Sequence, residues 1–295
     1  MENNSETRAG INHQQFLKSP VAADAAGFLS NLEVFAAKLF FCLFLLLPTF
    51  AIAQHYGSFQ KYWFIRNSDT LPYQMLLPAR YNPLKKYPLI IFLHGSGGRG
   101  NNNGSQMNNG GTLFIRDNIM LNYPAIVVFP QCEARSSWNT VIMQRDTAKK
   151  WIYTFPKDAP PKRSLQLLME LIPELEKNYA VDKERLYVGG LSMGGMGTYE
   201  LVDRMPDTFA AAFVICGAGD TGKVRELKKT AWWLFHGQKD STVYVTQAEN
   251  MKEALEEAGA DVKLTIYPED GHDSWNDAFK EPGLFEWMFK KRLTN

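Results

Sequence analysis

Cysteine is scarce in this chain, and its pattern excludes two kinds of small scaffold. Only three cysteines occur among the 295 residues, at positions 42, 132 and 216. No C-x-x-C pair and no paired Cys/His spacing is present, so neither a disulfide framework nor a zinc site is indicated. We expect Cys132 and Cys216 to be buried near strand ends as small hydrophobic residues, although in an exported protein they could pair.

A surplus of either charge is also missing. Lys and Arg number 32 and Asp and Glu number 31, for a net charge of +1. Proteins that bind nucleic acid or other polyanions normally carry a basic surplus, so this class is disfavoured. Charged residues make up 21% of the chain and apolar residues 45%, which is ordinary for a globular protein with a sizeable core. At this length the chain could form one large α/β domain or two small ones.

No apolar run is long enough to span a bilayer comfortably. The run Leu39–Leu47 follows Lys38 and precedes Ala51-Ile52-Ala53. A charged part, a short apolar part and an A-x-A site in this order predict a secretory signal peptide, with an uncleaved anchor as the alternative. We therefore expect an N-terminal extension with a signal peptide over residues 1–53, a folded domain over residues 54–295, and a secreted or periplasmic location.

Apolar runs that alternate with helical patterns predict the fold class. Strands are expected at residues 62–65, 71–77, 89–93, 125–129, 186–188, 209–216, 232–235 and 262–267, and helices at 163–178, 198–204, 244–258 and 284–292. The first two strands are joined by a short polar turn, which predicts an antiparallel hairpin. Pro173 predicts a kink or a break in its helix. The later alternation predicts an α/β fold with a mainly parallel, twisted sheet and helices on both faces.

The strongest local pattern lies at residues 186–197. An apolar strand runs into G-x-S-x-G, from Gly190 to Gly194 and centred on Ser192, and a helical segment follows. This context predicts a nucleophile elbow, in which a sharp turn strains Ser192 and the glycines avoid Cβ clashes. The hydroxyl would then lie at a helix N-terminus, where backbone N–H groups favour an oxyanion. A glycine-rich turn without chemistry is the alternative.

A second glycine-rich loop follows the strand at 89–93. It reads H-G-S-G-G-R-G from His94 to Gly100 and lacks the lysine and hydroxyl residue of a phosphate-binding P-loop. We interpret it as an oxyanion loop, with the backbone N–H of Ser96 acting together with that of Met193. The candidate substrate-binding residues in this loop are Gly95 and Arg99.

Two longer loops are expected near the same edge of the sheet. Residues 101–111 are rich in Asn and Gly and predict a mobile loop. Residues 133–162 are longer than an ordinary connection and carry several aromatic side chains, which could form a wall for a substrate or simply pack the loop down. Trp138 is the leading candidate for substrate contact, because it lies closest to the end of the preceding strand.

A serine nucleophile needs a base and an acid, and in this fold they follow the elbow in the order acid, then histidine. His272 follows both Ser192 and a plausible acid, and it is the predicted base. Asp240, in the loop of the strand just before, is the predicted acid, with Asp220 as the runner-up. The remaining histidines near strand ends, His94 and His236, are interpreted as structural.

These motifs together resemble the α/β-hydrolase superfamily. The likeness rests on the Ser192 elbow, the His94–Gly98 loop, Asp240 and Gly271-His272, and it extends over residues 60–293. It is nearest to secreted bacterial esterases, including feruloyl- and acetyl-esterase relatives, and to prolyl-oligopeptidase-like hydrolases. The resemblance implies an α/β-hydrolase catalytic domain over residues 54–295.

The resemblance also implies the chemistry. It indicates a Ser-His-Asp hydrolase of carboxylic esters, acting on acyl or feruloyl esters of carbohydrates, with no metal and no organic cofactor. A serine peptidase of the prolyl-oligopeptidase-like type is the first alternative, disfavoured because no N-terminal propeller is recognisable. A catalytically inactive binding module on the same scaffold is the second. The expected partner is a small-molecule or carbohydrate ester, with no nucleic acid and no membrane after signal cleavage; the sequence indicates no oligomeric state.

Overall fold

The computed structural model describes residues 57–293. The expected signal peptide, Cys42 and the boundary between residues 53 and 54 lie outside the described residues, so these expectations stay predictions. Within the described range, no helix combines the length and the apolar character that a membrane span requires.

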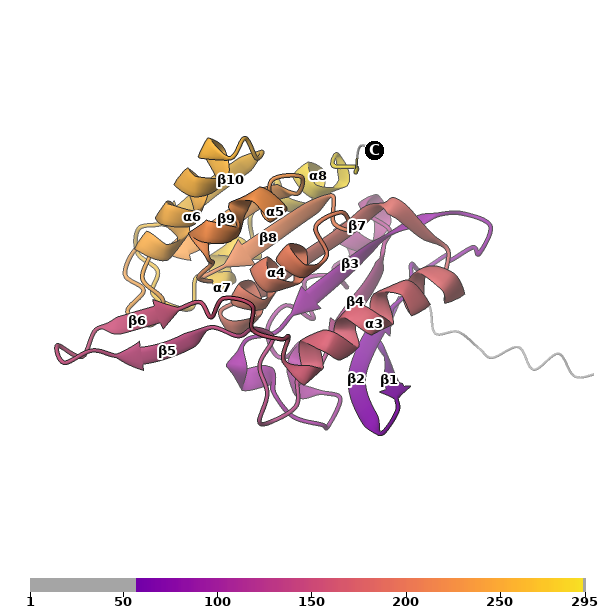
Figure 1. Ribbon diagram of the computed structural model, residues 1–295. Helices are drawn as coiled ribbons and strands as arrows, with labels where there is room; N and C mark the ends of the chain where they lie inside the picture. The colour runs from indigo at the N-terminus through magenta and orange to yellow at the C-terminus, as the bar shows by residue number, and fades with distance from the viewer. Residues whose placement is uncertain (1–56, 294–295) are drawn as a thin grey trace, which may run out of the picture. The chain divides into compact units, whose positions relative to one another are not determined.

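An eight-stranded sheet forms the centre of the domain (Figure 1). Across the sheet the strands are β1 (Gln60–Arg66), β2 (Asp69–Leu76), β4 (Ile126–Pro130), β3 (Tyr87–Leu93), β7 (Val181–Leu191), β8 (Ala211–Ile215), β9 (Ala231–Gly237) and β10 (Val262–Tyr267). β1 pairs with β2 and β2 with β4 in antiparallel fashion, and the other pairs are parallel. The predicted hairpin and the mainly parallel α/β sheet are therefore confirmed.

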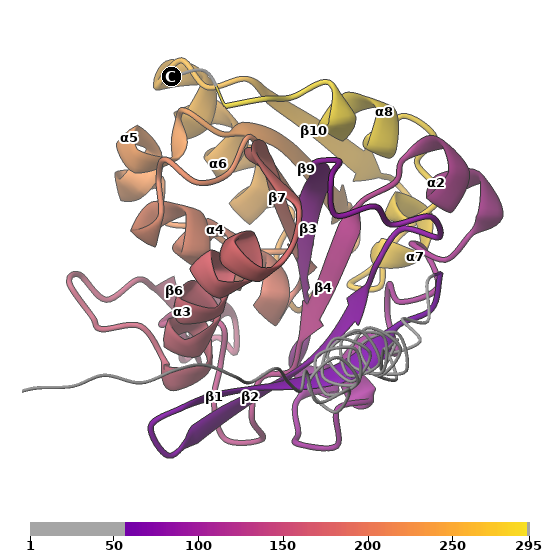
Figure 2. The same cartoon turned by 90° about the vertical axis from the view of Figure 1, so that its right-hand side faces the viewer.

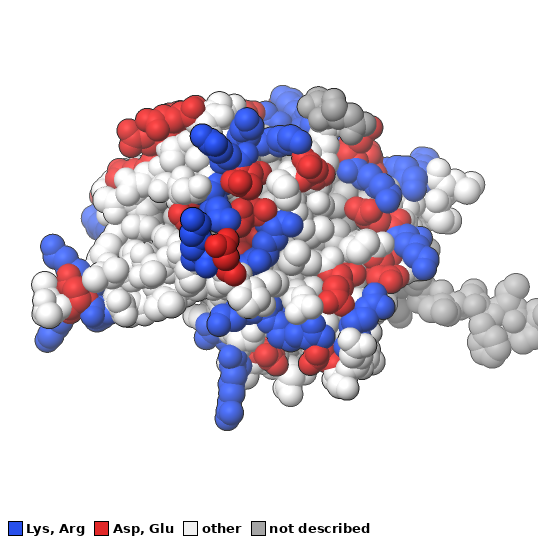
Figure 3. Space-filling model, viewed as in Figure 1, with Lys and Arg blue, Asp and Glu red and all other residues white. Residues whose placement is uncertain are grey.

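Helices cover both faces of this sheet (Figure 2). They are α2 (Asp117–Asn122), α3 (Arg163–Asn178), α4 (Met193–Arg204), α5 (Val224–Leu227), α6 (Thr246–Glu257), α7 (Trp275–Ala278) and α8 (Leu284–Phe289). In Figure 2, α3 to α6 lie on one side of the sheet, and α2, α7 and α8 lie on the other. Over the face of α3 to α6, basic and acidic side chains are interspersed (Figure 3), in keeping with the balanced composition.

The central strand β3 shows why its sequence is continuously apolar. Leu89 and Ile91 pack into the core cluster beneath α3, α4 and α6, whereas Ile90 and Phe92 pack into the cluster that includes α8. Successive side chains of a strand point to opposite faces, so a sheet that is covered on both sides needs apolar residues at every position. The continuous apolar run at 89–93 therefore arises because its side chains pack into a hydrophobic core on each face of the sheet.

Pro173 does not break α3, contrary to one of the two outcomes that the sequence suggested. The helix runs unbroken from Arg163 to Asn178. Proline removes one backbone hydrogen bond, but Pro173 is exposed while Leu171, Ile172 and Leu175 are buried against the sheet. Burial of this apolar stripe offsets the lost bond, so tertiary packing overrides the local preference.

The loop over 101–111 differs from the mobile segment that its composition predicts. Asn103 is 0% exposed, and its backbone N–H donates to Gln131 Oε1 at 2.7 Å. Its side-chain amide donates to the carbonyl oxygen of Tyr73 at 3.2 Å, and its own carbonyl accepts from Gln74 at 2.8 Å. Asparagine serves here to satisfy buried backbone groups, and the loop is thereby attached to β2.

A two-stranded antiparallel hairpin lies within residues 133–162 and was not predicted. It consists of β5 (Ile142–Arg145) and β6 (Trp151–Thr154). Each strand has only 4 residues, too few for a clear alternation of apolar and polar side chains. Figure 1 shows the hairpin projecting beyond the sheet, and the Tyr153 hydroxyl ties it to the carbonyl oxygen of Thr242 at 2.8 Å.

Candidate active site

The turn between β7 and α4 holds Ser192 in a conformation that few side chains adopt. Ser192 caps α4 with φ 53° and ψ −118°, outside the regions open to most L-residues. A Cβ atom at Gly194 would overlap the carbonyl oxygen of Leu93, and one at Gly190 would overlap that of Gly194. Neither position tolerates a side chain, so the glycines are needed and the turn has the geometry of an elbow.

Three side chains meet in line at the carboxyl ends of the strands. Ser192 Oγ lies 2.9 Å from His272 Nε2, and His272 Nδ1 lies 2.7 Å from Asp240 Oδ2. Because a carboxylate can only accept, Nδ1 carries the hydrogen and Nε2 is free to accept from the serine hydroxyl. The structure therefore brings together the predicted nucleophile, base and acid from three separate loops.

The position of Asp240 favours its ionised form. Its side chain is buried, which by itself would raise the pKa. Hydrogen bonds from His236 and His272 and from the N–H of Val243 outweigh burial and lower the pKa below its ordinary value. The runner-up acid, Asp220, instead accepts from the N–H of Gly222 at 2.9 Å. The carboxylate that orients His272 is therefore that of Asp240.

The oxyanion loop lies against the elbow. A Cβ atom built on Gly95 would lie 3.7 Å from Ser192 Cβ. Ser96 is the first residue of a short 3-10 helix, η1 (Ser96–Gly98), and Met193 is the first residue of α4. The first N–H groups of a helix have no partner within it, so both backbones can donate to a group beside Ser192. This arrangement agrees with the proposed pair of oxyanion donors.

His94 holds this loop in place, as its interpretation as a structural residue implies. The ring is 2% exposed, with Nδ1 2.6 Å from the carbonyl oxygen of Gly95. Its Nε2 accepts from the N–H of Cys132 at 3.0 Å, so the ring is neutral and carries its hydrogen on Nδ1. The loop is further fixed by Gln131, whose side-chain amide donates to the carbonyl oxygen of Gly98 at 3.1 Å.

Burial of His94 should make the protein sensitive to acid. Burial lowers the pKa of His94 from 6.5 to about 4, whereas the unfolded chain keeps the ordinary value, about 6.5. Between these values the unfolded state binds more protons, so the free energy of unfolding falls as pH drops from 6.5 towards 4, by about 3 kcal/mol at most. We expect urea unfolding of His94→Gln to show lower stability at pH 7 and a shallower pH slope than the wild type. Equal slopes would contradict this.

Two residues predicted to bind substrate are placed differently by the structure. Trp138 is 0% exposed and packs edge-on against His94, with ring centroids 5.3 Å apart, so it belongs to the core and not to a substrate wall. Gly95 is also buried, and its carbonyl oxygen already accepts from the N–H of Gly98 at 3.0 Å. Both therefore shape the oxyanion loop. Arg99 is partly exposed, so it stays a candidate for substrate contact. Its Nε is buried and has no hydrogen-bond partner within residues 57–293.

Cys216 lies beside the three candidate catalytic side chains, and the group could be taken for a metal site. Ligand atoms of Cys216, Asp240 and His272 lie within 4.8 Å of one another. Both His272 nitrogens are engaged, with Ser192 and Asp240, and burial raises the pKa of the Cys216 thiol well above its ordinary value. A neutral thiol is a poor metal ligand, so this set fits proton transfer better than metal binding. Cys132 and Cys216 are both buried and free, as expected of small hydrophobic residues at strand ends.

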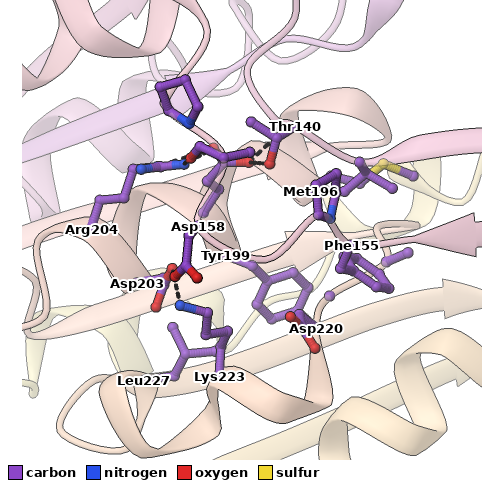
Figure 4. A pocket seen from close by; sticks show the side chains of 17 residues that line it. Thr140, Phe155, Asp158, Met196, Tyr199, Asp203, Arg204, Asp220, Lys223 and Leu227 are labelled. Atoms are coloured by element: carbon purple, nitrogen blue, oxygen red, sulfur yellow. Dashed lines mark hydrogen bonds and ion pairs between the residues drawn. The ribbon is translucent and has the colours of Figure 1, made fainter.

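A cavity of about 390 Å³ lies apart from these residues, along α4. Figure 4 shows Tyr199, Asp203 and Arg204 of α4 on its wall, facing Asp158 and Lys223. Neither Ser192, Asp240 nor His272 lines it. Two ion pairs lie on its wall, Arg204 with Glu200 and Lys223 with Asp203. Because none of the three candidate catalytic side chains lines this cavity, it is not the place where the candidate nucleophile acts.

The family is decided by the comparison with known protein families. The model of the phospholipase/carboxylesterase family matches residues 82–282, a range that holds the oxyanion loop, Ser192, Asp240 and His272. The chain belongs to this family. Its fold is the α/β-hydrolase fold that the motifs resemble.

Individual relatives agree with this family. A thermostable esterase of known structure is 32% identical with a TM-score of 0.71, over 79% of this chain and 63% of that one. A bifunctional acetylxylan esterase/xylanase of Neocallimastix patriciarum is 27% identical over 92 residues, which are 31% of this chain and 14% of that protein. The ferulic acid esterase of Anaeromyces mucronatus, at 18% identity, a TM-score of 0.56, and 79% and 90% coverage, shares the fold. The family and these relatives agree on an α/β-hydrolase scaffold, and the chain spans less than two thirds of the length of the thermostable esterase and of the bifunctional enzyme.

The sequence interpretation missed the second contact of Asp240. His236 was interpreted as structural, yet its Nε2 lies 3.3 Å from Asp240 Oδ2. The only hint in the sequence is the i,i+4 separation of His236 and Asp240, and this spacing does not fix the direction of either side chain outside a helix.

Proposed function

We propose that this protein is a serine hydrolase that cleaves carboxylic esters through an acyl-enzyme intermediate. The observation that carries the proposal is the unbroken line of contacts from Ser192 Oγ through His272 to Asp240, at 2.9 and 2.7 Å. His272 is 24% exposed at its side chain and Ser192 is partly exposed, so a substrate can reach them. Membership of the phospholipase/carboxylesterase family supports the same chemistry.

In the proposed mechanism Ser192 attacks the acyl carbon and its proton passes to His272 Nε2. The negative oxygen of the tetrahedral intermediate accepts from the backbone N–H groups of Ser96 and Met193. His272 then gives the proton to the leaving alcohol. Water enters, gives its proton to His272 and releases the acid, after which Ser192 regains the proton. Asp240 stays ionised throughout and stabilises the imidazolium.

The proposed substrates are acyl or feruloyl esters of carbohydrates. Support comes from relatives named acetylxylan esterase/xylanase and ferulic acid esterase. The open position of Ser192 also fits an ester carried on a bulky alcohol, because a partly exposed nucleophile does not require the substrate to enter an enclosed pocket. Export after removal of residues 1–53 is part of this proposal, and the N-terminal residue of protein recovered outside the cell tests it.

An ester panel tests the proposed substrate class. It contains p-nitrophenyl esters from acetyl to palmitoyl, a feruloyl-sugar ester, and an aminoacyl p-nitroanilide. We expect the highest kcat/KM on short acyl and feruloyl esters, because relatives are named acetylxylan esterase/xylanase and ferulic acid esterase. Strong preference for palmitoyl would indicate a lipase-type enzyme, and faster turnover of the amide would indicate the alternative peptidase.

A further inference from the structure

His236 lies at the end of β9 directly behind the acid of the candidate triad. Its side chain is 0% exposed. Its Nε2 lies 2.7 Å from the carbonyl oxygen of Val243 and 3.3 Å from Asp240 Oδ2. One ring nitrogen thus faces both the carboxylate of Asp240 and the backbone of Val243, three residues further on. His236 therefore connects the two ends of the loop that carries Asp240.

The hydrogen of this ring can be assigned from its partners. Among the described residues the other nitrogen, Nδ1, is buried without a hydrogen-bond partner. A protonated Nδ1 would leave a buried N–H unsatisfied, which is costly. Both groups facing Nε2 accept, so Nε2 carries the hydrogen. It donates to the carbonyl oxygen of Val243 at 2.7 Å, and Asp240 Oδ2 is its second, longer contact at 3.3 Å.

Asp240 is held at both oxygens. Oδ1 accepts from the N–H groups of Thr242 and Val243 at 2.8 and 2.9 Å. Oδ2 accepts from His272 at 2.7 Å and faces His236 Nε2. The backbone bonds fix where the carboxylate lies. His236 contacts the same oxygen that accepts the hydrogen bond from His272 Nδ1, so it influences the direction and strength of that hydrogen bond.

We propose that His236 is a positioning residue for the reaction, which directs Asp240 Oδ2 onto His272 and shares the charge of that oxygen. The inference rests on the proposed ester hydrolase function. A donor on Oδ2 draws off part of the negative charge that His272 would otherwise receive. Without it, the carboxylate stabilises imidazolium more strongly and holds the ring less well.

The other titratable groups that face Asp240 do not supply this effect. Two further titratable side chains interact with Asp240 electrostatically: Cys216, which directly follows β8, and Tyr153, which lies on β6. Burial raises the pKa of Tyr153 to about 12 and that of Cys216 well above its ordinary value. Both stay neutral at working pH, so a change in the titration of His272 upon substitution of His236 has its origin in His236.

Two substitutions at His236 separate donation from packing. His236→Met removes the donor and retains the volume, whereas His236→Gln places an amide nitrogen near the position of Nε2. We expect His236→Met to lower kcat about 10-fold, the low end for loss of a polar contact to a charged group, because Asp240 Oδ2 is then held less firmly onto His272. KM should change little. The acidic limb of kcat/KM should move to higher pH, since His272 must lose its proton to act. His236→Gln should retain most of the wild-type kcat and most of the wild-type position of the acidic limb.

Phe235→Leu is the matched control. Phe235 precedes His236 on β9, is also 0% exposed and packs on the opposite face. We expect it to lower the free energy of unfolding without moving the acidic limb. The proposal would be overturned if the acidic limb of kcat/KM does not move in His236→Met. It would also be overturned if that limb moves equally in Phe235→Leu. If His236→Met does not fold, His236→Gln is compared with His236→Asn, because the asparagine side chain is too short to reach Asp240 Oδ2. Equal kinetics in these two variants would also overturn the proposal.

NMR titration of His272 in the wild type and in the His236 variants measures the effect of His236 on the protonation of His272 directly, without a substrate. A wild type that fails to hydrolyse every ester in the panel would refute the proposed function. The NMR shift would then still decide whether His236 acts on the pair of Asp240 and His272. An unchanged His272 titration in His236→Met, with an active wild type, would refute only the positioning role.

Discussion

Replacement of Ser192 by alanine should lower kcat for ester hydrolysis about 10⁶-fold, which is the typical loss when the nucleophile of such a triad is removed. Ser192 Oγ is the only atom of the elbow placed to form the acyl-enzyme, at 2.9 Å from His272 Nε2. Alanine keeps the Cβ and the backbone strain, since φ stays at 53°. The free energy of unfolding should therefore change little, and the loss of activity would be chemical.

The effect of Ser192→Ala is measured in two ways, by labelling with a fluorophosphonate probe and by turnover of p-nitrophenyl acetate. The wild type should be labelled at Ser192, and Ser192→Ala should not be labelled. Ser68→Ala is a matched control, because Ser68 is exposed in the turn between β1 and β2 and should retain full labelling and turnover. Full turnover in Ser192→Ala would refute the mechanism, and a wild type that resists the probe would favour the inactive binding module.

Replacement of Asp240 by asparagine should lower kcat about 10⁴-fold with little change in KM, as it does when this acid is amidated in related triads. The amide oxygen can still accept from the N–H groups of Thr242 and Val243, which hold Oδ1 at 2.8 and 2.9 Å. The amide NH₂ then faces His272 Nδ1, 2.7 Å from the present Oδ2. Two N–H donors cannot face each other, so the hydrogen on His272 moves from Nδ1 to Nε2. A protonated Nε2 can no longer accept from the Ser192 hydroxyl.

Asp220→Asn is the natural control for this experiment, because Asp220 was the runner-up acid in the sequence. Its Oδ1 accepts from the N–H of Gly222, a bond that an asparagine oxygen can also make. We expect kcat close to that of the wild type, because Asp220 accepts from Gly222 and His272 Nδ1 is engaged with Asp240. A comparable loss in both variants would show that neither acid acts alone on His272 and would contradict the assignment to Asp240.

Much of the fold was predictable because its signals are local. Continuous apolar runs such as Leu89–Leu93 mark strands covered on both faces, and the pattern around Ser192 specifies a turn whose backbone only glycines can flank. The hairpin of β1 and β2 followed from a short polar connection. The expected helices at 163–178 and 244–258 correspond to α3 and α6. In each case the periodicity of one segment was sufficient, since side-chain direction repeats with the backbone.

The errors lie where a residue's role depends on a distant partner. Asn103 belongs to a stretch whose composition predicts a mobile loop. In the structure its side-chain amide donates to a buried carbonyl oxygen of β2, that of Tyr73. Trp138 lies near a strand end, as a substrate contact would, yet the ring of His94 and the backbone of α4 enclose it. The hairpin β5–β6 is held by contacts to the loop after β9. None of these partners is near in sequence, so composition alone pointed the wrong way.

The sequence by itself determined the sheet, the elbow and the chain order of Ser192 and His272, because these follow from periodicity, glycine sterics and motif spacing. Only the tertiary structure decided which carboxylate faces His272 and what supports it. Asp240 and Asp220 both follow strand ends, and the choice depends on the folded path of two loops. The contact of His236 with Asp240 Oδ2, at 3.3 Å, appears only once β9 and the following turn are packed. Hydrogen-bond partners in a buried site are set by distances of a few tenths of an ångström, which local patterns do not encode.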